Sequence, residues 1–140
     1  MATLVNDRIY FFGGSRRIPM ISPSWIQTHQ FNLSGDVFYL DLSSQFNVDL
    51  PPLTDLSFTS RMPFGSEKGV TVLENVCQEL TDYHFPGADP LQSLLIIYIF
   101  GGRVQIDTSS DVFILFDDFS TFDTLLLKWS NLSLPNHPSK

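Results

Sequence analysis

Cysteine and basic residues are scarce in this sequence of 140 residues. Cys77 is the only cysteine, and eight lysines and arginines stand against 15 acidic residues. A single thiol excludes an internal disulfide bond and a four-cysteine zinc site. Phosphate binding requires clustered cations, and Arg16-Arg17 is the only adjacent basic pair in a chain of net charge −7. The composition therefore argues against a nucleic-acid partner.

Long apolar segments are lacking as well. The longest apolar run, Leu94 to Phe100, is far shorter than the ~20 residues that a membrane helix needs. Residues 1–7 contain no basic stretch followed by a long apolar core, so no signal peptide is predicted. We expect no membrane segment in this chain. The sequence specifies no compartment, which leaves the cytoplasm as the default assignment.

Two apolar runs that end in a glycine doublet organise the rest of the sequence. Leu94 to Phe100 precedes Gly101-Gly102, and Arg8 to Phe12 precedes Gly13-Gly14. An apolar run of this length, bounded by glycine, indicates a strand buried on both faces. Glycine adopts positive φ freely and permits close approach of another backbone, so each doublet marks a sharp, crowded exit from its strand.

Three further strands are predicted around the first doublet. Ala2 to Val5 forms a hairpin with Arg8 to Phe12 through Asn6-Asp7. Val37 to Leu40 is the third strand, and the alternation in Phe46 to Leu50 is typical of a half-exposed edge strand. Together these strands predict one antiparallel meander, which cannot bury both of its faces alone.

Long connections separate the predicted strands. Gly14 to Gly35 is expected to be a surface loop, Ser60 to Gly69 a connector, and Glu74 to Ser93 an insertion. Val72, Val76 and Leu80 share helical spacing, which leaves a short helix open in the insertion. With no helix of ordinary length indicated elsewhere, the predicted class is all-β.

The two halves of the chain share a spaced set of residues. Each doublet is followed by two aspartates five residues apart and then by an aromatic residue. The first set is Gly13, Gly14, Asp36, Asp41 and Phe46, and the second is Gly101, Gly102, Asp118, Asp123 and Trp129. The repetition favours structural turns for these aspartates over a catalytic carboxylate pair.

This order of residues resembles the kelch repeat, in which an apolar strand, Gly-Gly, a loop, an aromatic strand ending in Asp, and a Trp follow one another. Phe46 stands where the family usually has Trp. Kelch units form β-propellers, each repeat being one four-stranded antiparallel blade. The resemblance implies one partial propeller over residues 1–140, with blades at about residues 2–54 and 61–134 and an insertion at 74–93.

The doublets lie much farther apart than the kelch period of ~50 residues. Either the second blade starts at Val70 and carries the insertion, or a whole blade between the copies has decayed. Both readings leave about two blades, whereas closed propellers have four to eight. We therefore expect either a fragment of a larger propeller or a ring completed by self-association through exposed blade faces.

By resemblance, the expected function is a protein-interaction module with a protein partner and no enzymatic activity. An alternative is an inactive remnant of a galactose-oxidase-type enzyme, whose copper site the resemblance would place among tyrosines, histidines and a cysteine. Here His29, His84 and His137 lie in three different predicted loops without metal-ligand spacing, and Cys77 lies in the insertion, so neither a metal nor another cofactor is predicted. A truncated gene product without a function of its own is a third reading.

Two Asn-x-Ser sequons begin at Asn32 and Asn131. In a chain with no signal peptide they are interpreted as chance matches, whereas an exported parent protein could carry glycans there.

Overall fold

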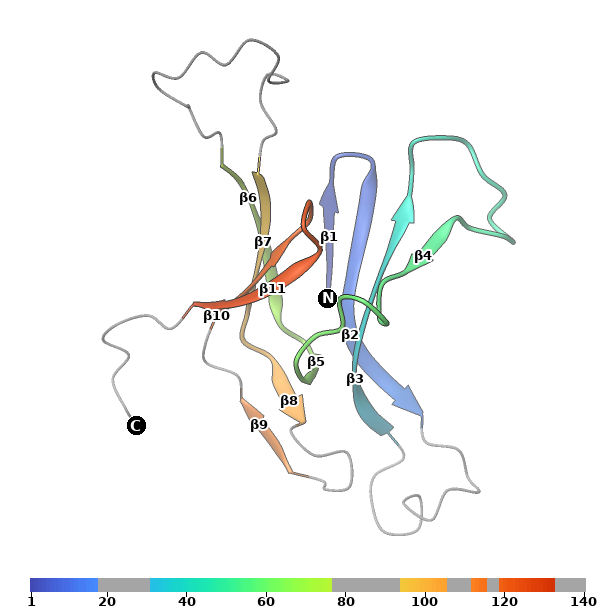
Figure 1. Cartoon of the computed structure of the whole chain (residues 1–140). Coiled ribbons are helices and arrows are strands. Elements are labelled where there is room, and N and C mark those ends of the chain that lie inside the picture. Colours follow the sequence, from blue (N-terminus) through green and yellow to red (C-terminus); the bar gives the residue numbers. More distant parts are fainter. Residues whose placement is uncertain (18–30, 77–93, 106–111, 116–118, 133–140) are drawn as a thin grey trace, which may run out of the picture.

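A computed structural model describes residues 1–17, 31–76, 94–105, 112–115 and 119–132. These segments contain eleven β-strands and no helix, so the predicted all-β class is confirmed. All strand pairs are antiparallel. Two sheets of four strands and one of three strands result (Figure 1).

The N-terminal sheet is a meander in which neighbouring strands follow one another along the chain. Its order is β1 (Ala2–Val5), β2 (Arg8–Arg17), β3 (Phe31–Asp41) and β4 (Leu53–Asp55). Asn6, at φ 51°, closes the turn between β1 and β2, because asparagine tolerates the left-handed region better than most residues.

The C-terminal sheet repeats this strand order in the second half of the chain. It consists of β6 (Val70–Val76), β7 (Leu94–Phe100), β10 (Phe119–Asp123) and β11 (Lys128–Leu132). A small sheet of β5 (Gly65–Glu67), β8 (Arg103–Gln105) and β9 (Phe113–Leu115) extends it beyond Gly101-Gly102.

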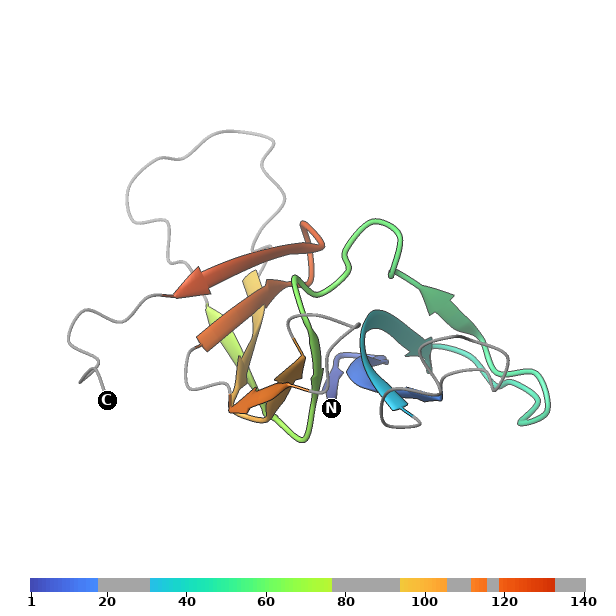
Figure 2. The ribbon, with the colours of Figure 1, turned by 90° about the horizontal axis from the view of Figure 1, so that it is seen from below.

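The two four-stranded sheets pack face to face around an aromatic core, and Figure 2 shows them side by side. The Phe122 ring lies 6.1 Å from Tyr10 and 5.4 Å from Phe12, measured between ring centroids. Trp129 lies edge-on to Phe12 at 5.6 Å. The remaining buried core side chains are Val5, Val37, Leu56, Met62, Ile97 and Ile99.

The fully buried side chains of each sheet lie on one of its two faces. Along β7, Ile97 and Ile99 are buried, whereas Ile96 and Tyr98 are half-buried and Phe100 is exposed. The prediction that this strand is buried on both faces is therefore wrong for the described part of the chain. Successive side chains of a strand point to opposite faces, and the other sheet covers only the face of Ile97 and Ile99.

The predicted fourth strand is also misplaced. Phe46 to Leu50 contains no strand, and Val48 and Leu50 are more than four-fifths exposed. The edge position is taken instead by β4, in which Leu53 pairs with Leu40 and Thr54 with Tyr39. Pro51 and Pro52 precede β4, and neither has a backbone N–H to donate. The backbone N–H of Leu53 donates a hydrogen bond to the Pro51 carbonyl.

Several predicted connections are shorter than expected. Strand β2 continues through the first doublet to Arg17 and β3 starts at Phe31, so only residues 18–30 of the expected loop lie outside the described segments. Strand β5 lies within the expected connector, and β8 and β9 lie after the second doublet. Residues 74–76 belong to β6 and not to a helix, while the rest of the insertion is outside the described residues.

Candidate functional site

All four glycines of the two doublets have positive φ. Gly13 and Gly14 have φ of 62° and 127°, and Gly101 and Gly102 have φ of 69° and 94°. All four values lie in a region that residues with a side chain rarely adopt. In β2 the doublet produces a register shift after Phe12, and in the second half it separates β7 from β8.

Neighbouring backbone packs closely against both doublets. A Cβ atom on Gly13 would lie 2.1 Å from the Ser66 carbonyl oxygen, and one on Gly102 would lie 2.5 Å from the Glu67 carbonyl oxygen. Both contacts are far inside van der Waals distance, so no side chain fits. The doublets thus bring β2 and β8 against the same strand, β5.

Two of the paired aspartates lie at the ends of equivalent strands and bind the turns that follow. Asp41 ends β3, and its Oδ1 atom accepts a hydrogen bond of 2.9 Å from the Ser43 N–H. Asp123 ends β10, and its Oδ1 atom accepts 2.8 Å hydrogen bonds from the N–H groups of Leu125 and Leu126. Both side chains supply local turn contacts.

The other two aspartates of the repeated set are Asp36 and Asp118. Asp36 lies in β3, where its carboxylate pairs with Arg16 and its N–H donates to Ser34 Oγ at 3.0 Å. Asp118 lies outside the described residues.

The aligned aromatic residues of the two sets, Phe46 and Trp129, are not structurally equivalent. Trp129 is half-buried in β11 and donates a 2.7 Å hydrogen bond from Nε1 to the Ser60 carbonyl, whereas Phe46 is exposed outside any strand.

A polar cluster joins the sheets beyond the doublets. The Glu67 carboxylate accepts hydrogen bonds from Arg103 and, at 2.6 Å, from Ser15 Oγ. These bonds, first of all the one from Arg103, hold the pKa of Glu67 below its ordinary value. Gln105 accepts a 2.7 Å hydrogen bond from the Leu33 N–H. The partners come from both halves of the chain, so this cluster has a structural explanation.

A pocket of about 450 Å³ opens at the opposite end of the sheets. It lies between the Asn6-Asp7 turn, the end of β3 and the turn after β10, with Leu95 and Thr124 in its wall. Arg8 reaches into this region, 3.6 Å from Asp41 and 4.7 Å from the centre of the Tyr39 ring. A guanidinium, a carboxylate and exposed turn residues suit contact with a polar peptide segment.

Only some of the remaining predicted residues lie in the described part of the chain. Asn32 is half-buried within β3, where its Oδ1 atom accepts a 3.2 Å hydrogen bond from Gln105 Nε2. Asn131 lies in β11. The histidines and Cys77 are outside the described segments.

The described residues contain no group of three or more histidine, cysteine or acidic side chains that could hold a metal ion. They also contain no helix long and apolar enough to cross a membrane.

Sequence reasoning missed three structural contacts of the fold. Glu67 with Arg103, Ser60 with Trp129, and Leu53 in the edge strand all depend on pairs far apart in the chain. A local pattern carries no signal for such pairs, although the two prolines before Leu53 mark where regular pairing can restart.

Comparison with known proteins finds no matching protein-family model, no similar curated protein and no similar solved structure.

Proposed function

We propose that this chain is a partial kelch-type propeller that acts as a protein-interaction module. The observation that carries the proposal is the repeated unit: a four-stranded antiparallel sheet with a positive-φ glycine doublet directly after the apolar part of its second strand and a turn-binding aspartate at the end of its third strand. The unit occurs twice, in the consecutive strands β1 to β4 and again in β6, β7, β10 and β11. Its resemblance to the kelch repeat supplies the expected role.

The contact surface in this proposal is the pocket end of the sheets. Asp7 and Leu125 are exposed there on two different turns, next to the ion pair of the exposed Arg8 with the half-buried Asp41. Loops and turns held by a rigid sheet scaffold commonly carry binding residues. The paired end residues of β6 and β7, Val76 and Leu94, lie at the same end, because Leu95 in the pocket wall follows the first residue of β7.

The test starts from the full chain cross-linked in cells, followed by titration of the purified candidate partner. A double variant, Asp7→Lys with Leu125→Asp, changes two exposed turn side chains and should weaken binding at least tenfold, or about 1.4 kcal/mol. Lys68→Asn is the matched control, since Lys68 is exposed beside the doublets at φ 62° and asparagine tolerates that conformation.

Equal binding by the wild type, the double variant and the Lys68→Asn control would contradict the proposed surface. Stoichiometric copper uptake with oxidase turnover would favour the enzyme reading, and failure of the chain to accumulate in cells would favour a gene product without its own function.

A further inference from the structure

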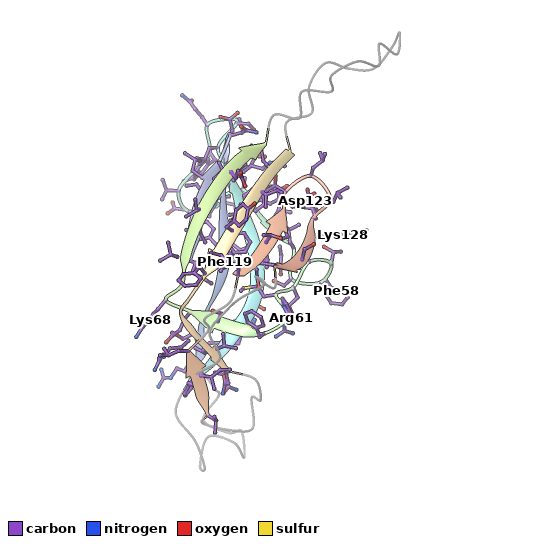
Figure 3. All side chains as sticks on the ribbon, turned by 90° about the vertical axis from the view of Figure 1, so that its left-hand side faces the viewer. Phe58, Arg61, Lys68, Phe119, Asp123 and Lys128 are labelled. Carbon is purple, nitrogen blue, oxygen red and sulfur yellow. The ribbon has the colours of Figure 1, made fainter. Side chains whose placement is uncertain are left out.

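Both outer faces of the two-sheet core carry several apolar side chains. On the N-terminal sheet, Ile9, Phe11, Phe38 and Leu40 are half-buried, with Leu4 and Leu53 more than half exposed. On the C-terminal sheet, Val70 and Val72 are about three-fifths exposed and Phe100 is 43% exposed. Figure 3 looks onto this second face, with Phe119 labelled on it. Apolar patches of this kind mark association surfaces.

The glycine doublets and strand registers define which residues of the two sheets are equivalent. Phe12 and Phe100 each precede a doublet, and they pair with Val37 and Phe119 in the third strand of their sheets. Counting back from the doublets makes Tyr10 equivalent to Tyr98. By the same register, Leu40 is equivalent to Phe122 and Leu53 to Trp129. These two equivalences follow from the pairing of the strands and not from sequence similarity.

Equivalent residues point to opposite sides in the two sheets. Tyr10 and Phe12 are in the core, whereas their counterparts Tyr98 and Phe100 are on the outer face of the C-terminal sheet. Phe122 is in the core, whereas its counterpart Leu40 is on the outer face of the N-terminal sheet. The core thus joins two different faces of one unit, which is a heterologous contact. Each outer face corresponds to the face that the other sheet turns inward.

The contact between the two inner sheet faces can be repeated between the outer faces of two molecules. Inside the chain, Phe12 packs on Phe122 and Trp129 at 5.4 and 5.6 Å. The corresponding contact between two chains places Phe100 of one copy against Leu40 and Leu53 of the next. A hollow of about 350 Å³, lined by Phe38 and Leu53 with a polar rim of Arg16, Asp36 and Asp55, lies on that face.

We infer that a second copy of this chain covers each outer face, head to tail, through a repetition of the core contact. Repetition of a heterologous contact gives a closed ring when the rotation closes. Rings of four to eight units correspond to two to four chains. This inference deepens the self-association expected from the two-unit architecture, and it does not depend on the partner proposed for the pocket end.

Sedimentation equilibrium of the purified full chain tests the stoichiometry. The expected result is one species of two, three or four chains of 15.9 kDa each, unchanged over a hundredfold range of concentration. A monomer at all concentrations, or open polymers that lengthen with concentration, would overturn the inference.

Two single variants separate a head-to-tail contact from a symmetric one. Leu53→Asp blocks the outer face of the N-terminal sheet, and Phe100→Asp blocks that of the C-terminal sheet. Each variant alone should be monomeric, and an equimolar mixture should form a one-to-one pair that grows no further, since only the two unblocked faces can meet. Dimers of either variant alone, or no pair in the mixture, would contradict the model. Circular dichroism confirms that both variants fold.

A cross-linking variant keeps the inference testable if either charged variant unfolds. Leu53→Cys with Phe100→Cys, in a Cys77→Ser background, places one thiol on each outer face. A short bismaleimide spans the ~10 Å between packed sheets and should link chains to each other, ending at the ring size found by sedimentation. Phe100→Cys alone is the control and should not cross-link. Linking by the control, or none by the double variant, would count against the model.

Failure of these experiments and failure of the proposed function are distinguishable. A full-length wild-type chain that is monomeric but still binds the partner would refute the head-to-tail contact alone. Assembly without any effect of the pocket-end variants would refute only the proposed binding surface.

Discussion

At the scale of single residues, the doublets and Glu67 show how the two halves are held together. Gly13 lies against the Ser66 carbonyl, and the Glu67 side chain binds Arg103 and Ser15. One short strand, β5, therefore makes close backbone contact with β2 on one side and pairs with β8 on the other. Changes at these positions should affect the stability of the whole protein.

The two residues of the first doublet should respond differently to alanine. Gly13→Ala adds both backbone strain at φ 62° and a clash with the Ser66 carbonyl, and we expect a loss above about 3 kcal/mol. Gly14→Ala meets nothing within 4 Å, so only strain remains, about 1–3 kcal/mol. Urea unfolding measures both, and equal losses would show that the close contact is absent in solution.

The lowered pKa of Glu67 predicts an acid-sensitive contact. A carboxyl group with a pKa depressed in the folded state stabilises that state above its unfolded pKa, near 4.5, and loses this stabilisation as the pH falls through the folded value. The melting temperature should therefore decrease as the pH is lowered below about 5.

The variant Glu67→Gln should lower stability at pH 7 by about 1–2 kcal/mol and flatten its dependence on pH below 5. Asp41 and Asp55, whose pKa values are also lowered, by hydrogen bonds from Ser43 and Ser57, are present in both proteins. An unchanged acid slope in the variant would assign the effect to those aspartates.

At the scale of elements, the two halves of the chain agree at the ends of their third strands and differ in the connections that follow. Asp41 and Asp123 end equivalent strands, yet the connections after them differ. A four-residue turn follows β10, whereas a long segment with two prolines follows β3. This difference displaces the edge strand to Leu53–Asp55 and leaves Phe46 exposed.

Trp129 and Phe46 should therefore differ in their contribution to stability. Trp129→Phe keeps a ring beside Phe12 and Phe122 but removes the donor to the Ser60 carbonyl, at a cost of about 1–3 kcal/mol. Phe46→Ala should cost less than about 1 kcal/mol, because that side chain is exposed. Thermal unfolding compares them, and a larger loss at Phe46 would be inconsistent with this edge strand.

The connection between β6 and β7 should be dispensable for folding. Val76 and Leu94 are directly paired, so a two-residue Asn-Gly turn can replace residues 77–93. The shorter loop lowers the entropy cost of closure, and stability should stay equal or rise by about 1–2 kcal/mol. Chemical denaturation provides the measurement. A variant that does not fold would mean that residues 77–93 contribute to the core.

At the scale of the whole molecule, the two sheets share one core. Phe122 contacts Tyr10 and Phe12 from the other sheet as well as Trp129 from its own. Neither sheet can bury its inner face without the other, so we expect a single cooperative unfolding transition.

Phe122→Ala tests this cooperativity. The side chain is fully buried, and its truncation should cost about 3–5 kcal/mol. Hydrogen exchange should accelerate in both sheets, including the amides of β2 that contact the removed ring. Phe58→Ala, at a fully exposed side chain, should stay within about 0.5 kcal/mol of the wild type. Faster exchange confined to the C-terminal sheet would indicate two independent units.

Local pattern was enough to define the all-β class, the first hairpin, the strand before each doublet and the turn-forming aspartates. These features depend on the alternation of apolar residues and on the conformational freedom of glycine, which are properties of neighbours in sequence. Tertiary structure alone decided which face of β7 is buried, where the edge strand lies, and that Glu67 pairs with Arg103. Those outcomes depend on contacts between distant segments, and an apolar strand has the same sequence whether one or both of its faces are covered.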